Sequence, residues 1–132
     1  MADDGAEVLG FGALFSFEGR ANRGTFWKVM LLILGGVGVV AALVIPKLAT
    51  AGGADAPPDT TTLVLIVAGY ALVLWISLAT QVKRWHDMDK SGWFALLNLI
   101  PAINFFVFLY IGFNPGTEGS NRFGAGPRKI LF

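Results

Sequence analysis

The residues with the clearest chemical potential lie in one short polar stretch, residues 83–93, with the sequence KRWHDMDKSGW. It contains the only histidine of the chain, His86, next to Asp87. A histidine beside a carboxylate can act as an acid and base pair, titrate near neutral pH or bind a metal. A zinc site, however, takes three or four nitrogen, sulfur or carboxylate ligands, and the chain has no cysteine. We therefore expect no metal, no cofactor and no catalytic residue here.

Two arginines form the second candidate group. Arg20 and Arg23 lie three positions apart, which is one turn if the segment is helical, so both guanidinium groups could engage phosphate oxygens. Lipid headgroups supply the nearest phosphates. The structural alternative is that these arginines pair with Glu18, Asp87 or Asp89 and tie the loops together.

A third polar stretch follows near the C-terminus, residues 114–127, with the sequence NPGTEGSNRFGAGP. Its glycines, prolines and asparagines indicate turns. Arg122 within it could fold back onto the acidic residues of the stretch 83–93. The three stretches would then form one polar cap, which is either a structural clamp or a pocket for an anion or a lipid headgroup. The candidate residues are Arg20, Arg23, Arg84, His86, Asp87, Lys90, Asn121 and Arg122.

The elements that position these residues follow first from composition. The chain has 132 residues, the size of one domain, and is 55 % hydrophobic and only 14 % charged, which is hard to fit into a soluble domain. Lipid is the expected solvent. Ten basic and nine acidic residues nearly balance, so nucleic acid is not an expected partner. The expected partners are membrane lipids, and either another membrane protein or a second copy of the chain.

Two apolar runs have the length of a membrane-spanning helix. Residues 26–46 are uncharged apart from Lys28, and residues 62–82 are uncharged. About 20 apolar residues cross the roughly 30 Å of hydrocarbon in a bilayer. We expect Pro46 to end the first helix and residues 47–61, rich in glycine and proline, to form an exposed loop.

Small residues gather on one face of the first predicted helix. Gly35, Gly38 and Ala42 are spaced at i, i+3 and i+7, so a neighbouring helix backbone could approach closely there. This face is interpreted as a packing surface inside the protein, or alternatively as a seam for self-association.

A third apolar run, residues 93–113, follows the polar loop 83–92 and carries Asn98, Pro101 and Asn104 at its middle. Proline removes a helix hydrogen bond and clashes with the preceding turn, so the run is expected to be broken. Either one kinked helix crosses the membrane, or two half-length helices enter and return on the same side. The two halves would be residues 93–100 and 103–113.

Basic residues near the membrane ends predict the orientation, because cytoplasmic loops are enriched in lysine and arginine. They precede the first span and fill the polar loop, which places the N-terminus in the cytoplasm. The tail, residues 114–132, is also basic, and it is cytoplasmic only if the third run returns. Residues 8–17, before the first span, are apolar and aromatic and are expected to lie at the membrane interface. The predicted fold is an all-α integral membrane protein with two full spans and a third broken segment.

Three motifs now carry a family resemblance. They are FEGRANRGTFW at residues 17–27, RWHDMDKSGW at 84–93 and GTEGSNRFG at 116–124. In this order they resemble the domain of unknown function 805 family of small bacterial inner-membrane proteins, over about residues 15–127. The resemblance implies a multi-pass protein of the bacterial inner membrane. Because that family has no established activity, it supplies no catalytic residues.

Three classes of function remain. The first is a noncatalytic membrane protein that binds lipids or partners through its polar cap. The second is a transporter or channel component, against which stands the lack of charge inside the first two spans. The third is a lipid-modifying enzyme, which would need His86 and Asp87 as an acid and base pair facing a headgroup.

Overall fold

The computed structural model of the chain describes residues 10–50 and 57–127, and its regular elements within these ranges are helices. The predicted all-helical class is therefore confirmed. The elements are η1 (Phe11–Leu14), α1 (Arg23–Thr50), α2 (Thr60–Asp87), η2 (Gly92–Leu99) and α3 (Pro101–Phe113), where η marks a 3₁₀ helix.

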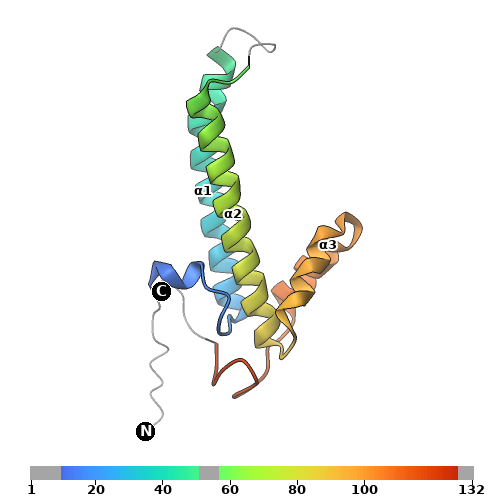
Figure 1. Cartoon of the computed structure of the whole chain (residues 1–132). Coiled ribbons are helices and arrows are strands. Elements are labelled where there is room, and N and C mark those ends of the chain that lie inside the picture. Colours follow the sequence, from blue (N-terminus) through green and yellow to red (C-terminus); the bar gives the residue numbers. More distant parts are fainter. Residues whose placement is uncertain (1–9, 51–56, 128–132) are drawn as a thin grey trace.

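Helices α1 and α2 lie side by side as a long antiparallel pair (Figure 1). Each has 28 residues, which gives a length of about 42 Å at 1.5 Å per residue. Both are long and apolar enough to cross a membrane, and only 11 % of the most apolar stretch of either helix is buried within the protein. A water-soluble core helix would be mostly covered. The exposed apolar surface of this pair suits contact with lipid, and each helix is longer than the roughly 30 Å of hydrocarbon in a bilayer.

The loop predicted for residues 47–61 is shorter than expected, because α1 continues through Pro46 to Thr50 and α2 begins at Thr60. Pro46 removes one hydrogen bond, but its fixed φ angle suits a helix. The Thr50 hydroxyl donates to the Pro46 carbonyl at 3.0 Å and so stabilises the last turn. Residues 51–56 of the predicted loop lie outside the described residues.

Asp59 begins α2 as its N-cap. The Asp59 carboxylate accepts the backbone N–H of Thr62 at 2.7 Å, and this bond holds the pKa of the Asp59 carboxyl below its ordinary value. The helix then continues to Asp87, so residues 83–87 are helical and the predicted polar loop 83–92 is shortened. Hydropathy marks where the hydrocarbon ends, and a helix can continue beyond it.

The α2 helix ends in a tight turn that redirects the chain. Asp89 has a φ of 56°, in the left-handed region that aspartate tolerates, and the Lys90 backbone N–H donates to the Trp85 carbonyl at 2.9 Å. The Ser91 hydroxyl then accepts the Trp93 N–H as the N-cap of η2.

The third apolar segment forms a short hairpin of η2 and α3, as the returning alternative predicted. The eight residues of η2 and the 13 of α3 extend about 16 Å and about 20 Å, so neither spans the hydrocarbon. Pro101 occupies the first turn of α3, where its missing N–H costs nothing, and Ile100 is extended as residues before proline prefer. Ile100 alone thus separates η2 from α3, and α3 begins two positions earlier than predicted.

Both ends of this hairpin lie at the same end of the molecule. The start of α1 and the end of α2 meet there, since the Ala21 N–H donates to the Lys83 carbonyl at 3.1 Å. The Trp27 indole on α1 donates to the Gly112 carbonyl at 3.0 Å, which fixes the end of α3 beside them. Buried side chains from all these helices form the core at this end; they are Phe26, Trp85, Ala95, Val107 and Ile111.

The small-residue face of α1 does not pack inside the protein. Apart from the neighbouring residues and backbone of α1 itself, no atom lies within 4 Å of a Cβ built on Gly35 or Gly38, and Ala42 is exposed. The interpretation of this face as an internal packing surface is therefore wrong, because α2 lies against a different face of α1.

Candidate functional site

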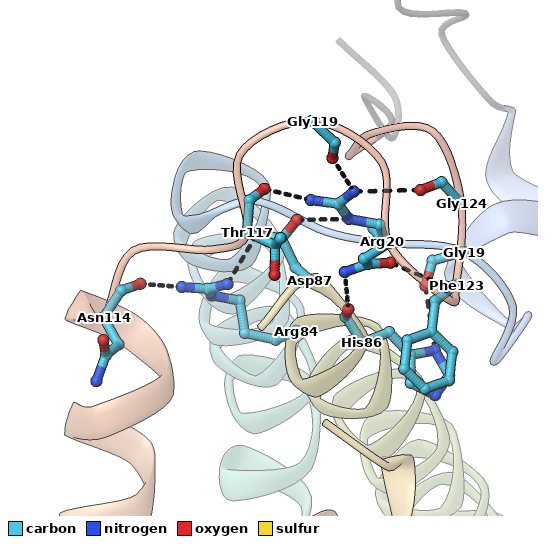
Figure 2. A network of polar contacts seen from close by, with 11 residues as sticks. Gly19, Arg20, Arg84, His86, Asp87, Asn114, Thr117, Gly119, Phe123 and Gly124 are labelled. Carbon is cyan, nitrogen blue, oxygen red and sulfur yellow. Dashed lines mark hydrogen bonds and ion pairs between the residues drawn. The ribbon is translucent and has the colours of Figure 1, made fainter. Parts of the chain in front are cut away.

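Asp87, the last residue of α2, lies at the centre of a buried polar network (Figure 2). Its Oδ1 accepts the Arg20 Nε–H at 3.0 Å, and its Oδ2 accepts an Arg84 Nη1–H at 2.9 Å. All three side chains are almost completely buried. One carboxylate thus bridges two guanidinium groups, one from the segment before α1 and one from α2.

The remaining donors of Arg20 hold the C-terminal tail. Nη1 donates to the carbonyls of Gly119 and Gly124, and Nη2 donates to the Thr117 carbonyl at 2.6 Å. The tail therefore wraps around this side chain, as Figure 2 shows. The hydrogen bonds of Arg20 join the N-terminal segment, α2 and the tail. This arrangement is the alternative in which the arginine pairs with an acidic residue and ties the loops together.

The segment from Arg20 to Arg23 is not a helical turn, so the condition for a shared phosphate site is not met. Helix α1 begins at Arg23, so Arg20 lies in the irregular segment before it, and its side chain is buried. Arg23 is exposed and donates to the Phe113 carbonyl at 3.3 Å, at the end of α3. The two guanidinium groups therefore bind to different parts of the protein.

The tail also approaches the end of α2 through its own backbone. The Thr117 N–H donates to the Asp87 carbonyl at 2.7 Å, and Arg84 Nη2 donates to the Asn114 carbonyl. A Cβ on Gly116 would overlap the Asp87 carboxylate, so only glycine fits there. Sequence reasoning missed Gly116 and Thr117, although both belong to the third motif.

His86 contacts both the N-terminal segment and the tail. Its Nδ1 lies 3.2 Å from the Gly19 carbonyl, and since a carbonyl only accepts, we assign the proton to Nδ1. The ring stacks on Phe123 with centroids 3.9 Å apart, and Asn121 Nδ2 donates to the His86 carbonyl at 2.8 Å. His86 and Asp87 turn to different partners and do not form an acid and base pair.

Arg122 folds back onto the turn after α2, as predicted. Its Nε donates to Asp89 Oδ1 at 3.1 Å and its Nη2 to the Asp89 carbonyl at 2.8 Å, but both side chains are exposed. The Lys90 ammonium, also a candidate, has no hydrogen-bond or ion-pair partner among the residues that the structure describes. Within the same residues, no group of three or more histidine, aspartate or glutamate side chains could hold a metal ion.

A cavity of about 850 Å³ lies between the N-terminal segment, the end of α2 and the tail. Lys83, His86 and Arg20 line it, and so does the exposed Glu18. The Lys83 side chain is buried, and its ammonium donates to the Ala13 carbonyl. We call this space the polar pocket. Sequence reasoning missed Lys83 as a site residue because it read the side chain only as an orientation signal.

The polar pocket lies beside an excess of buried positive charge. Arg20, Lys83 and Arg84 are buried, and Asp87 is the one buried carboxylate in the described parts of the chain. Both oxygens of Asp87 already accept from the arginines, which leaves Lys83 without a carboxylate partner there. The arrangement can therefore stabilise a negative charge placed in the pocket.

Comparisons with known proteins agree with the membrane fold. A family model described as "Protein of unknown function (DUF805)" matches residues 14–125. The chain is 33 % identical over 112 residues to the inner membrane protein YhaH of Escherichia coli (strain K12), covering 85 % of this chain and 87 % of the relative. It is also 33 % identical over 114 residues to the inner membrane protein YhaI of the same organism, covering 85 % and 86 %. No solved structure matches the chain.

Proposed function

Because the chain belongs to the DUF805 family and is an inner-membrane protein like its relatives, we propose that it is a noncatalytic binding protein whose polar pocket takes an anionic, phosphate-bearing group. The polar cap comprises residues 10–23, 83–93 and 114–127 in the structure. The observation that carries the proposal is the buried Lys83 ammonium beside an open pocket.

A buried charge without a partner of opposite sign is costly, since burial removes its hydration. The Lys83 ammonium has three N–H donors, and the structure gives one of them a partner, the Ala13 carbonyl. Two donors are left for a ligand. A phosphate or similar anion in the polar pocket would accept from them and offset the excess charge.

The arginines of the cap support the pocket rather than bind the anion. Arg20 directs its Nε and both terminal nitrogens to protein acceptors, and Arg84 directs both terminal nitrogens to Asp87 and Asn114. Their charges still add to the positive field of the pocket. Because His86 and Asp87 are each engaged with other partners, the arrangement favours binding over acid and base catalysis.

We further propose that the cap faces the cytoplasm, with the described segments before α1 and after α3 on that side and two complete crossings. Basic residues are concentrated at the cap end of α1 and α2, and cytoplasmic ends of membrane helices carry this excess. The residues at that end are Arg20, Arg23, Lys28, Lys83, Arg84, Lys90 and Arg122, whereas Lys47 lies at the far end of α1.

The test is binding of glycerol phosphate, a headgroup without acyl chains, to the full chain in detergent micelles. Wild-type protein is expected to show saturable stabilisation against heat, and Lys83→Gln is expected to weaken binding at least about tenfold. Lys90→Gln, which removes a lysine charge outside the pocket, is the matched control and should bind as wild type does. Glu18→Gln removes the opposing charge at the pocket edge and should tighten binding.

Two results would contradict this proposal. One is the absence of any saturable effect of glycerol phosphate on the wild-type protein. The other is equal binding by Lys83→Gln and wild type, which would place the anion elsewhere.

A further inference from the structure

A second cavity, of about 400 Å³, adjoins the polar pocket and is lined mainly by residues of α2 and η2. The two cavities share three wall residues, Phe17, His86 and Phe123. The stacked rings of His86 and Phe123 therefore form the boundary between them. Beyond this boundary the lining is mainly apolar, and we call this second space the apolar trough.

The apolar trough runs from the cap toward the hydrocarbon. Along α2 it is lined by His86, Val82 and Leu78, which are spaced four residues apart and so share one face of the helix. These positions cover about 12 Å along the helix axis. Its opposite wall is η2, where Trp93 and Leu96 contribute side chains that are themselves exposed.

The two cavities together match one kind of ligand. A small soluble anion would fill the polar pocket and leave the trough open to lipid. A neutral apolar molecule would fill the trough and leave Lys83 uncompensated. A molecule with a phosphate at one end and a hydrocarbon chain at the other fills both cavities. Such a molecule can enter from the bilayer with its hydrocarbon chain still among the lipid chains.

We infer that the protein holds a single anionic glycerophospholipid, with its phosphate at Lys83 and one acyl chain in the apolar trough. The inference rests on the proposed function and adds the ligand class to it. The lipid lies with its headgroup at the level of the cap, where both long helices emerge from the hydrocarbon. The ring pair of His86 and Phe123 lies where the glycerol unit passes from one cavity to the other.

The experiment measures retained lipid by native mass spectrometry of the full chain, in micelles doped with phosphatidylglycerol or with phosphatidylcholine. Wild-type protein is expected to retain one phosphatidylglycerol and at least about tenfold less of the zwitterionic lipid. Leu78→Trp, which fills the trough, should lower the occupancy of phosphatidylglycerol about tenfold. Val67→Trp is the matched control, since Val67 is also an exposed apolar residue of α2 but lies outside the trough.

The glycerol phosphate measurement on the same variants separates this inference from the proposed function. Leu78→Trp should keep the wild-type response to glycerol phosphate, which also shows that the variant is folded. Retention of phosphatidylglycerol by Leu78→Trp at the wild-type level would overturn the acyl-chain site while leaving the anion site intact. Equal retention of phosphatidylcholine and phosphatidylglycerol by the wild type would overturn the choice of an anionic lipid.

Discussion

Two arginine–aspartate pairs of the polar cap have the same contact geometry and opposite surroundings. Arg20 meets Asp87 at 3.0 Å with side chains that are 0 % and 4 % exposed. Arg122 meets Asp89 at 3.1 Å with side chains that are 67 % and 45 % exposed. The two aspartates are only two residues apart. The difference indicates that the burial of the side chains, rather than the distance between them, determines which pair stabilises the cap.

The surroundings differ because of the backbone around each aspartate. Asp87 ends α2 facing the core side, where the tail covers it through Gly116 and Thr117. Asp89 lies in the left-handed turn that follows, which carries its side chain out to solvent. An exposed pair is screened by water and contributes little, whereas a buried charge that loses its partner is strongly destabilising.

The largest expected effect comes from removing the charge of Asp87. Asp87→Asn leaves two buried guanidinium groups without a carboxylate and should lower the free energy of unfolding by about 3–5 kcal/mol. Asp89→Asn is the matched control, since it removes one charge from an exposed pair and asparagine tolerates the left-handed turn. That control should cost less than about 1 kcal/mol. Thermal unfolding in detergent micelles measures both, and equal losses would remove the distinction between the pairs.

A smaller effect is expected where the tail meets Asp87. Gly116→Ala places a methyl group against the Asp87 carboxylate, so the tail must shift, at a cost of about 1–3 kcal/mol. Gly126→Ala is the control, because no atom lies within 4 Å of a Cβ there, and it should change stability by less than about 0.5 kcal/mol. Hydrogen exchange at the Thr117 amide should rise in the first variant only. If it stayed protected in Gly116→Ala, Gly116 would not lie against the Asp87 carboxylate as closely as the structure places it.

The smallest expected effect extends the comparison to an uncharged contact outside the cap. Asn98 on η2 donates to the Gln81 side chain on α2 and to the Ala95 carbonyl at 2.9 Å. Asn98→Ala should cost about 1 kcal/mol, the usual range for polar contacts between membrane helices. Asn104→Ala is the control, because Asn104 is exposed on α3. The difference between their unfolding midpoints measures the contact, and no difference would mean that Asn98 does not tie η2 to α2.

Hydropathy was enough to predict the two long helices, because these depend on the solvent that each residue needs, and Pro101 was enough to predict the break in the third segment. Hydropathy could not predict where helices end. Pro46 lies inside α1, and residues 83–87 remain helical beyond the apolar run. The first error arose because the fixed φ angle of proline suits a helix, and the second because backbone hydrogen bonds do not stop at the boundary of the hydrocarbon.

The sequence predicted only some of the contacts within the polar cap. The return of Arg122 to the central stretch followed from charge, and the structure confirms it at Asp89. The inward turn of Arg20 and the burial of Lys83 depend on the path of segments without a hydropathy signal. The close approach of Gly116 depends on tertiary packing, and no single sequence reveals it.

The most direct test of the closed cap is the side of the membrane on which the tail lies. The chain has no cysteine, so single cysteines can be labelled with a membrane-impermeant maleimide without background. The account predicts that Ser120→Cys and Lys90→Cys react from the same side, and that Pro57→Cys, between α1 and α2, reacts from the other. Labelling of Ser120→Cys together with Pro57→Cys would place the tail away from Asp87 and contradict the account.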